Sequence, residues 1–277
     1  MSSLKLIPLG TVAPYCKDDK KCPGYLIKYN EQNIILDLGN GAISNMNLPE
    51  DLSNLKVFIS HFHPDHYGDL TALFEAALVY NRLGFLNGVI PIYLPKYYIK
   101  EDIYYPGEDG WYTSKTLEKT PLDYRYLEQY QKNCPIKIIG YDKLNIEENG
   151  IKISSLVVPH TIKSNAIKVE IEDKIIVYSS DTGTKNNLRE FAKNADLFIC
   201  EATFLKGQSR LDDSHLFAYE AAQIAKDANV KELALTHFWP EIDKSLYVEE
   251  AKEYFDNVCS LEERKEKVLI YDKRSSK

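Results

Sequence analysis

Residues 61–66, His61-Phe62-His63-Pro64-Asp65-His66, place three imidazoles and one carboxylate within six positions. They follow Lys56–Ser60, a short apolar run that predicts a strand. In an extended chain the side chains of residues i and i+2 point the same way, so His61 and His63 can converge on one cation. Pro64 turns the chain, and we expect Asp65 and His66 to begin a helix and to face a neighbouring point. Four nitrogen or carboxylate ligands without cysteine indicate two divalent metals rather than one structural zinc.

The segments around this motif predict strands first and an alternation of strands and helices later. An apolar face at helical spacing predicts a helix from Leu70 to about Gly84. The other predicted strands are Leu4–Leu9, Tyr25–Tyr29, Asn33–Leu38, Ile151–Val158, Ala166–Ile171, Lys174–Ser179, Ala195–Cys200, Lys231–Thr236 and Lys267–Tyr271, and the other predicted helices are Asn186–Lys193, His215–Ala228 and Ser245–Asn257. This order indicates two sheets sandwiched by helices, an α/β (α+β) fold.

The composition excludes several classes of protein. The chain has 277 residues and a net charge of −7, which argues against a nonspecific nucleic-acid or membrane coat. No apolar run approaches the roughly 18 residues of a membrane span. The N-terminal Met1–Gly10 lacks the charged and apolar regions of a signal peptide. We therefore expect a soluble cytoplasmic protein with no membrane partner.

The five cysteines do not form a framework, because their number is odd and they contain no CxxC pair. Cys16 and Cys22 are the two closest in sequence. We expect them to be loop or part-buried thiols, and a disulfide between them is the alternative.

Residues 93–132 differ in composition from the rest of the chain. They contain nine of the twenty tyrosines, together with Trp111, and six Lys or Arg against seven Asp or Glu. Aromatic residues supply contact area at low entropy cost. We interpret residues 1–277 as one domain with a cap or arm inserted over the site at about 93–132; a homodimer contact and an ordinary outer layer are the alternatives.

The histidine motif and four further positions, in order along the chain, resemble the signature of the metallo-β-lactamase superfamily. The further positions are Asp37 in Leu36-Asp37-Leu38-Gly39, His160 in Val158-Pro159-His160, Asp181 in Ser179-Ser180-Asp181-Thr182-Gly183, and His237 in Leu235-Thr236-His237-Phe238. The resemblance runs from about residue 5 to residue 240 and implies a four-layer αββα sandwich. It implies that His61, His63 and His160 hold one metal, that Asp65, His66 and His237 hold the second, that Asp181 bridges both, and that Asp37 supports the histidine loop from behind the ligands.

The charge of such a centre favours an anionic substrate. Two divalent cations bring +4, which two carboxylates and one hydroxide reduce to about +1. Zinc is the expected metal, because imidazole and carboxylate ligands suit it, with manganese or iron as alternatives. A hydroxide bridging the two metals is the expected nucleophile.

Two further segments resemble the tRNase Z-like branch of the superfamily, which includes small cyclic phosphodiesterases. They are Cys200-Glu201-Ala202-Thr203-Phe204 and Ser214-His215. The resemblance implies that Glu201 positions His215, which protonates the leaving oxygen. We expect His215 to open a helix, whose N-terminus disfavours the imidazolium, while Glu201 favours it, so that the pKa stays near neutrality. Capping of that helix by His215, beside Ser214, is the structural alternative.

The sequence therefore predicts a dinuclear zinc phosphodiesterase for a small or cyclic phosphodiester, with Asp65, Glu201 and His215 as catalytic residues. We expect tyrosines of the insertion and Trp239 to wall the pocket or stack on a base; packing is the alternative for Trp239. A tRNA 3′-processing endoribonuclease with an RNA partner is one alternative, although the insertion is slightly acidic and phosphate binding relies on Lys and Arg. An ester or lactone hydrolase would leave the Glu201–His215 pair without a task. A non-catalytic metal-binding scaffold comes last, since each expected ligand is present.

Overall fold

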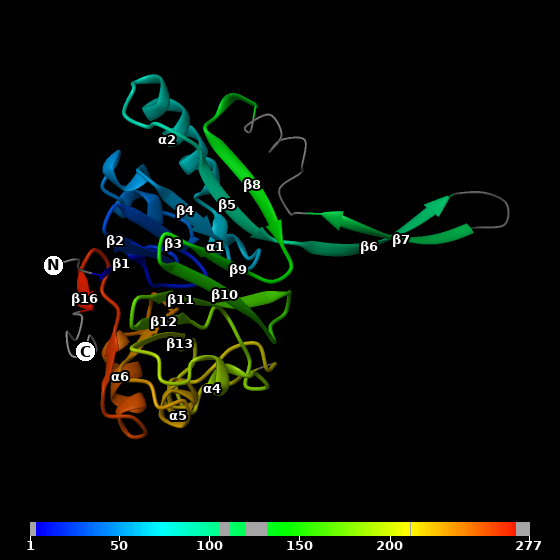
Figure 1. The fold of residues 1–277 in the computed structure, drawn as a ribbon. Helices are drawn as coiled ribbons and strands as arrows, with labels where there is room; N and C mark the ends of the chain where they lie inside the picture. Colours follow the sequence, from blue (N-terminus) through cyan, green and yellow to red (C-terminus); the bar gives the residue numbers. More distant parts are fainter. Residues whose placement is uncertain (1–3, 106–110, 120–131, 211, 270–277) are drawn as a thin grey trace.

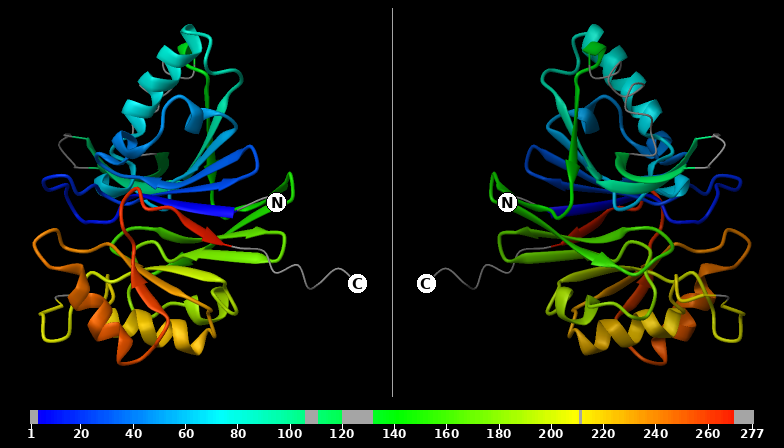
Figure 2. Two further views of the ribbon diagram at one scale, coloured as in Figure 1. Left: turned by 90° about the vertical axis from the view of Figure 1, so that its left-hand side faces the viewer. Right: turned by 90° about the vertical axis from the view of Figure 1, so that its right-hand side faces the viewer.

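The computed structural model describes residues 4–105, 111–119, 132–210 and 212–269, and for residues 97–105 and 111–119 it describes the backbone alone. Two seven-stranded sheets lie face to face, and helices cover their outer sides (Figure 1, Figure 2). The αββα sandwich predicted from the sequence is confirmed. None of the helices in the described ranges is long and apolar enough to cross a membrane.

The first sheet has the strand order β16-β1-β2-β3-β4-β5-β8. Its strands are β1 (Leu4–Gly10), β2 (Gly24–Tyr29), β3 (Gln32–Leu38), β4 (Leu55–Phe58), β5 (Ile90–Pro95), β8 (Ile136–Tyr141) and β16 (Lys267–Leu269). The pairs from β16 to β3 are antiparallel, and the pairs from β3 to β8 are parallel.

The second sheet repeats this pairing pattern in the order β15-β14-β13-β12-β11-β10-β9. Its strands are β9 (Asn145–Glu148), β10 (Ile151–Val158), β11 (Ser164–Ile171), β12 (Lys174–Tyr178), β13 (Leu197–Glu201), β14 (Leu233–Thr236) and β15 (Val258–Ser260). The pairs from β9 to β12 are antiparallel, and the pairs from β12 to β15 are parallel. In parallel strands the carboxyl ends meet at one edge, where α/β proteins commonly bind ligands.

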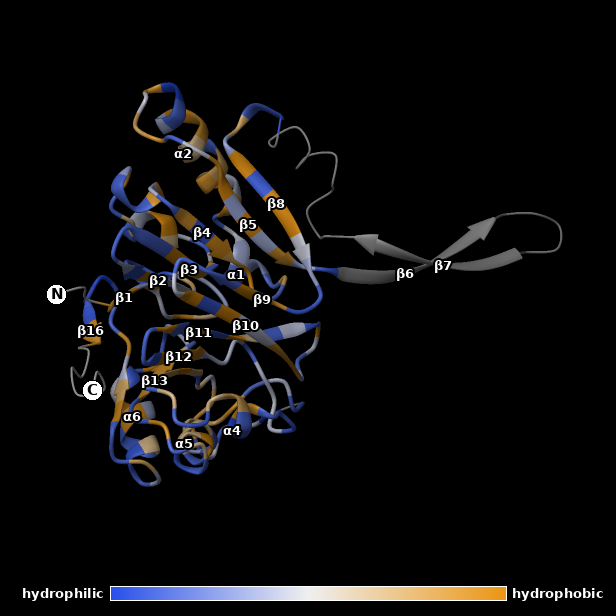
Figure 3. Cartoon of the chain, viewed as in Figure 1, coloured by the Kyte–Doolittle hydropathy of each residue, from blue (hydrophilic) through white to orange (hydrophobic). Residues whose placement is uncertain are grey.

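Three apolar clusters hold the four layers together. One lies between the two sheets, and the other two lie between each sheet and its helices. The first sheet is covered by α2 (Leu70–Arg82), which buries Leu73, Phe74 and Ala77; burying a large apolar side chain stabilises by about 1.5–3 kcal/mol. The second sheet is covered by α4 (Leu188–Phe191), α5 (Ala218–Asp227) and α6 (Lys244–Lys252). In Figure 3 the orange apolar residues lie in the strands and in the helices that cover the sheets, with blue hydrophilic residues between them.

Several predicted element boundaries are wrong, and tertiary pairing explains two of them. The helix predicted from His215 begins at Ala218, because Phe217 pairs in a parallel bridge with Phe204 and the backbone before it is drawn out of helical geometry. The helix predicted to Asn257 ends at Lys252, since the following residues form β15 beside β14. The helix predicted over 186–193 is confined to α4, and strands β5, β8, β9 and β15 are not among the predictions.

The segment predicted to be an insertion, residues 93–132, starts within β5. Tyr93 lies within that strand and stacks on Phe58, with ring centroids 4.5 Å apart, so it belongs to the sandwich. Beyond it, β6 (Tyr97–Tyr105) and β7 (Trp111–Lys119) form a two-stranded ribbon that extends away from the sandwich (Figure 1). The side chains of the other tyrosines, from 97 to 130, lie outside the described residues, so the cap and homodimer roles stay predictions.

Cys16 and Cys22 are free thiols, the first exposed and the second buried, with their Sγ atoms 3.8 Å apart. The disulfide is therefore not formed in this structure, and the thiol interpretation is confirmed.

Candidate metal centre and active site

The candidate ligands lie where strands of both sheets end. His61 and His63 follow β4, and Pro64 begins the short helix α1 (Pro64–Tyr67), which carries Asp65 and His66 as predicted. His160 follows β10, Asp181 follows β12, and His237 follows β14. The two halves of the chain therefore deliver side chains to one point at the shared edge of the sheets.

Unusual backbone conformations direct three residues of this region. Asp37, Ser180 and His237 have φ values of 57°, 54° and 65°, in the left-handed region that non-glycine residues rarely occupy. Asp37 is also the extra residue of a β-bulge, since the β2–β3 register shifts between Gly24 and Tyr25. Residues held in such conformations cluster at functional sites, where the surrounding structure maintains them.

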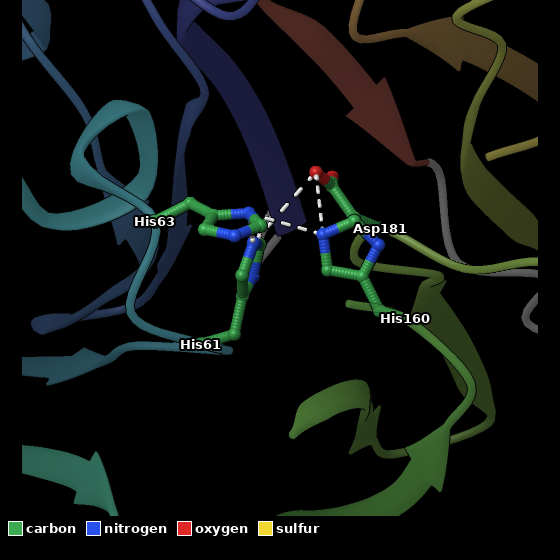
Figure 4. Close-up of side chains that lie close together, drawn as sticks. All are labelled: His61, His63, His160 and Asp181. Atoms are coloured by element: carbon green, nitrogen blue, oxygen red, sulfur yellow. Dashed lines mark hydrogen bonds and ion pairs between the residues drawn. The ribbon is translucent and has the colours of Figure 1, made fainter. Parts of the chain in front are cut away.

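One group of candidate ligands consists of His61, His63, His160 and Asp181, whose side chains point toward one another (Figure 4). His63 Nδ1 lies 3.2 Å from His61 Nε2 and 3.0 Å from His160 Nε2. Asp181 Oδ2 lies 3.7 Å from His61 Nε2 and 3.8 Å from His160 Nε2. The structure thus brings together the three imidazoles that the resemblance assigns to the first metal.

The second group consists of Asp65, His66 and His237, again with Asp181 beside it. His66 Nε2 lies 3.5 Å from Asp65 Oδ2 and 3.4 Å from His237 Nε2. Asp181 reaches His66 Nε2 at 3.3 Å and His237 Nε2 at 3.0 Å. Because Asp181 borders both groups, its position suits the bridging role that the resemblance implies.

Hydrogen bonds at the outer ring nitrogens orient the imidazoles. His66 Nδ1 donates to Asp37 Oδ2 at 2.7 Å, and His160 Nδ1 donates to the carbonyl oxygen of Ser214 at 2.8 Å. The Ser60 hydroxyl gives its proton to Asp37, so His61 Nδ1, 3.0 Å from Ser60 Oγ, is the donor in their contact. In these three rings Nδ1 carries a proton, and Nε2 is the nitrogen that faces the centre. Such outer partners are a regular feature of metal-binding histidines.

Buried oxygens without hydrogen bonds indicate where cations fit. Among the described residues, Asp65 Oδ2 and Asp181 Oδ1 are buried and accept no hydrogen bond. A buried carboxylate oxygen is unfavourable unless it is paired with a charge or a metal. Imidazole nitrogens and carboxylate oxygens are ligands that suit zinc. The residues present therefore fit two divalent cations, one in each group.

Electrostatics distinguish the two groups in the metal-free chain. Burial holds the pKa of His61 well below its ordinary value and lowers the pKa of His63 to about 4, so these rings stay neutral. Burial also opposes charge on His237, but the charge and hydrogen bond of Asp181 raise the pKa of His237 to about 10. His66 behaves alike: its pKa lies well above the ordinary value, despite burial, because of Asp181 and Asp65. Protons thus balance the carboxylates where cations would otherwise do so.

A second pair of groups lies beside the ligands. Glu201, at the end of β13, is buried, and its Oε1 accepts hydrogen bonds from His215 Nδ1 at 3.0 Å and from the backbone N–H of Thr182 at 2.8 Å. The His215 ring stacks on that of His237, with centroids 5.2 Å apart. The structure therefore joins Glu201 and His215, as expected, and places them at the centre.

The predicted placement of His215 at a helix N-terminus is wrong. Phe217 occupies the N-cap of α5, so His215 neither caps this helix nor lies within the first turn, where a helix dipole acts. Burial lowers the pKa of His215, but the charge and hydrogen bond of Glu201 outweigh it, and the pKa lies above its ordinary value. The carboxylate of Glu201, with a smaller contribution from the charge of Asp181, therefore favours the protonated imidazole, the form that a proton donor requires.

Several of the candidate ligands and His215 line a small cavity. Its volume is about 340 Å³, and its lining residues are Pro14, His63, Pro64, Asp65, Asp181, His215 and His237. A larger cavity, about 580 Å³, includes Phe238 and Trp239 but none of the candidate ligands. We assign the site to the smaller cavity because the converging titratable groups line it. Trp239 packs edge-on against Phe204, at 5.6 Å between ring centroids, and does not line this cavity.

Several residues of the site are not among the sequence predictions. Ser60 and Tyr178 donate hydrogen bonds to Asp37, and Pro14 lines the cavity. Thr203 lies in the quoted Cys200–Phe204 motif, where its hydroxyl touches both Glu201 and His237. The position of Thr203 in that motif is the one signal that could have found it; the other three depend on long-range contacts.

Comparisons with known proteins place the chain among metallo-β-lactamase-fold enzymes. The model of a family described as "Anti-Pycsar protein Apyc1" matches residues 4–242. A ribonuclease Z of Thermococcus onnurineus (strain NA1) is 31% identical over 290 residues, which cover 91% of this chain and 90% of the relative. The metallo-β-lactamase fold protein YhfI from Bacillus subtilis has a TM-score of 0.77 at 24% identity, covering 96% of this chain and 99% of that chain. Human tRNase Z, short form, has a TM-score of 0.67 at 18% identity, covering 95% of this chain and 98% of that chain.

Proposed function

Because this chain belongs to the family of the anti-Pycsar protein Apyc1, in the RNase Z-like branch of the metallo-β-lactamase superfamily, we propose that it is a dinuclear phosphodiesterase. The chain is a metallo-β-lactamase-fold hydrolase related to ribonuclease Z. The proposal adds two bound divalent metal ions, with zinc as the preferred metal, and a small or cyclic phosphodiester as substrate. In this proposal His61, His63 and His160 hold one metal, Asp65, His66 and His237 hold the other, and Asp181 is shared.

The observation that carries the proposal is the position of His215. A metal centre alone would serve esters, lactones and phosphodiesters alike. Here the same cavity that contains Asp65 and Asp181 also contains an imidazole held by a buried carboxylate. Among the described residues no hydrogen bond reaches His215 Nε2, and the side chain is 20% exposed, so this nitrogen is available to a substrate. A proton donor at this place suits a leaving group that departs as an alkoxide.

In the proposed phosphodiester hydrolysis, different residues of the chain have different roles. Two bound cations would supply Lewis-acid chemistry, lowering the pKa of water and neutralising charge on phosphoryl oxygens. Asp37 holds His66 in place, and Ser214 holds His160, so the ligand geometry is prepared before substrate arrives. His215 Nε2 donates its proton to the leaving oxygen. Glu201 stabilises the charged imidazole before that transfer.

The size and charge of the site favour a small substrate. A cavity of about 340 Å³ is at the lower end of the range for small-molecule sites. The net charge of −7 is unfavourable for a long contact with an RNA backbone. RNA cleavage is nevertheless the second candidate, because a relative 31% identical over most of both chains is named ribonuclease Z.

A substrate panel tests the proposal. Zinc-loaded protein is compared on a cyclic nucleotide, a precursor tRNA, a lactone and an aryl phosphodiester, with chelator-treated protein as one control. A His160→Ala variant, purified in the same way, is the second control, because it removes a ligand and exposes contaminating activity. We expect the zinc-loaded protein to have its highest kcat/KM on the cyclic nucleotide, and neither control to hydrolyse this substrate. Preference for the lactone, or activity that survives in the controls, contradicts the proposal, and preference for precursor tRNA supports the second candidate.

A further inference from the structure

Thr203 occupies a position between the proton donor and the metal centre. Its side chain is buried, and its hydroxyl lies 2.8 Å from Glu201 Oε2 and 2.8 Å from His237 Nδ1. His215 Nδ1 is 3.2 Å from the same hydroxyl. One oxygen atom thus contacts the carboxylate, the proton donor and a candidate ligand of the second metal.

Counting protons fixes the direction of these hydrogen bonds. A hydroxyl has one proton to donate and two lone pairs that accept. Glu201 Oε2 accepts only, so it receives the Thr203 proton. The contact with His237 therefore requires a proton on His237 Nδ1. Its Nε2, 3.0 Å from Asp181 Oδ2 and 3.6 Å from Asp65 Oδ2, is then the nitrogen that can bind a cation.

Glu201 has no spare capacity to replace this link. Its Oε1 accepts from His215 and from the Thr182 backbone N–H, and its Oε2 accepts from the Leu216 backbone N–H at 3.2 Å as well as from Thr203. Among the described residues, the carboxylate makes no hydrogen bond or ion pair with His237. The Thr203 hydroxyl is therefore the connection between them.

We infer that Thr203 is a positioning residue that presents His237 Nε2 to the second metal and, through the same hydroxyl, steadies Glu201 for His215. This inference rests on the proposed function, because it requires a metal at His237. It predicts that removing one hydroxyl weakens metal binding as well as proton donation. A role in packing alone would leave metal affinity unchanged when the shape of the side chain is kept.

Two substitutions separate these roles. Thr203→Val keeps the shape and removes the hydroxyl, whereas Thr203→Ser keeps the hydroxyl and removes a methyl group. Thr182→Val is a matched control, since Thr182 is also buried beside Asp181, but among the described residues its hydroxyl bonds only to the backbone oxygen of Gly183. Zinc affinity is measured on each metal-free chain by competition with a chromophoric chelator, without substrate. We expect Thr203→Val to weaken one of two zinc sites by about 10–100-fold, while Thr203→Ser and Thr182→Val stay close to wild type.

The outcome is decided by the comparison among variants and by one measurement on the wild-type protein. Wild-type affinity in Thr203→Val, or equal losses in Thr203→Val and Thr203→Ser, overturns the inference. Nitrogen-15 NMR of zinc-loaded wild type, with histidine labelled, should show a proton on Nδ1 of His237 and zinc on Nε2. The opposite arrangement overturns the inference even if no variant folds. A wild type that binds fewer than two zinc ions contradicts the proposed function instead, so the two failures are distinct.

Discussion

Replacing His215 by alanine should slow phosphodiester hydrolysis in proportion to how poor the leaving group is. The imidazole is held at the centre by a hydrogen bond of 3.0 Å to Glu201, and its removal deletes none of the ligands that the proposed function assigns to the two metals. Glu201 keeps its hydrogen bonds from the Thr182 and Leu216 backbone N–H groups and from the Thr203 hydroxyl. We therefore expect His215→Ala to fold and to bind metal like the wild type.

The size of the effect follows from the role of the proton. A positioned general acid contributes about 10²–10⁴-fold in rate, or roughly 3–5 kcal/mol of transition-state stabilisation. A sugar oxygen that leaves as an alkoxide needs that proton, so kcat on a cyclic nucleotide should fall by about this factor. A nitrophenolate is stable without a proton, and kcat on an aryl phosphodiester should change far less.

The assay compares kcat on the two substrates for wild type and variant, with the zinc content of each preparation measured in parallel. The unequal loss on the two substrates is the diagnostic result, because lost metal would reduce both rates together. An equal reduction on both substrates, or full activity on the cyclic nucleotide, refutes the assignment of His215 as proton donor.

Three further perturbations test the surroundings of the centre. Asp37→Asn presents an amide to the donors on Ser60 and His66. Chelator competition should show zinc binding weakened by about 10–100-fold, and urea unfolding should show the free energy of unfolding lowered by about 1–3 kcal/mol. Unchanged zinc affinity argues against the support role of Asp37. Asp181→Asn removes the charge that both ligand groups share, so elemental analysis should find at least one zinc ion fewer per chain than in the wild type. A variant that still binds two zinc ions per chain is inconsistent with bridging by Asp181. Zinc uptake near pH 7 should release protons, because Asp181 raises the pKa of His66 and His237 against the effect of burial. Zinc affinity should therefore fall as the pH falls. Calorimetry in buffers of different ionisation enthalpy detects the proton release, and a binding enthalpy that does not depend on the buffer counts against it.

The part of the site that depends on short-range geometry is predictable from sequence. His61 and His63 follow a strand at a spacing of two, and Asp65 and His66 lie in the turn of helix that Pro64 begins. Strand periodicity directs His61 and His63 to one side of the chain, and adjacency in sequence keeps Asp65 and His66 close to them. The apolar patterns of β10 and α2 likewise predict their own bounds closely, because each element buries one regular face.

The rest of the site depends on contacts between distant segments. His160, Asp181 and His237 come from the other sheet, and no spacing rule states which strands are neighbours; here the resemblance to a family supplies the order. His215 is displaced from the helix by the bridge between Phe204 and Phe217, which competes with local helix propensity. Thr203 is two residues from Glu201 but 34 from His237, so its double contact is visible only in the folded chain.

The central claim, that two metal ions in this centre drive phosphodiester hydrolysis, is tested most directly by titrating metal-free protein with zinc and following hydrolysis of a cyclic nucleotide. The account predicts no activity before zinc is added and a plateau at two zinc ions per chain. Activity in the metal-free protein, a plateau at one ion per chain, or inactivity at full zinc loading contradicts it.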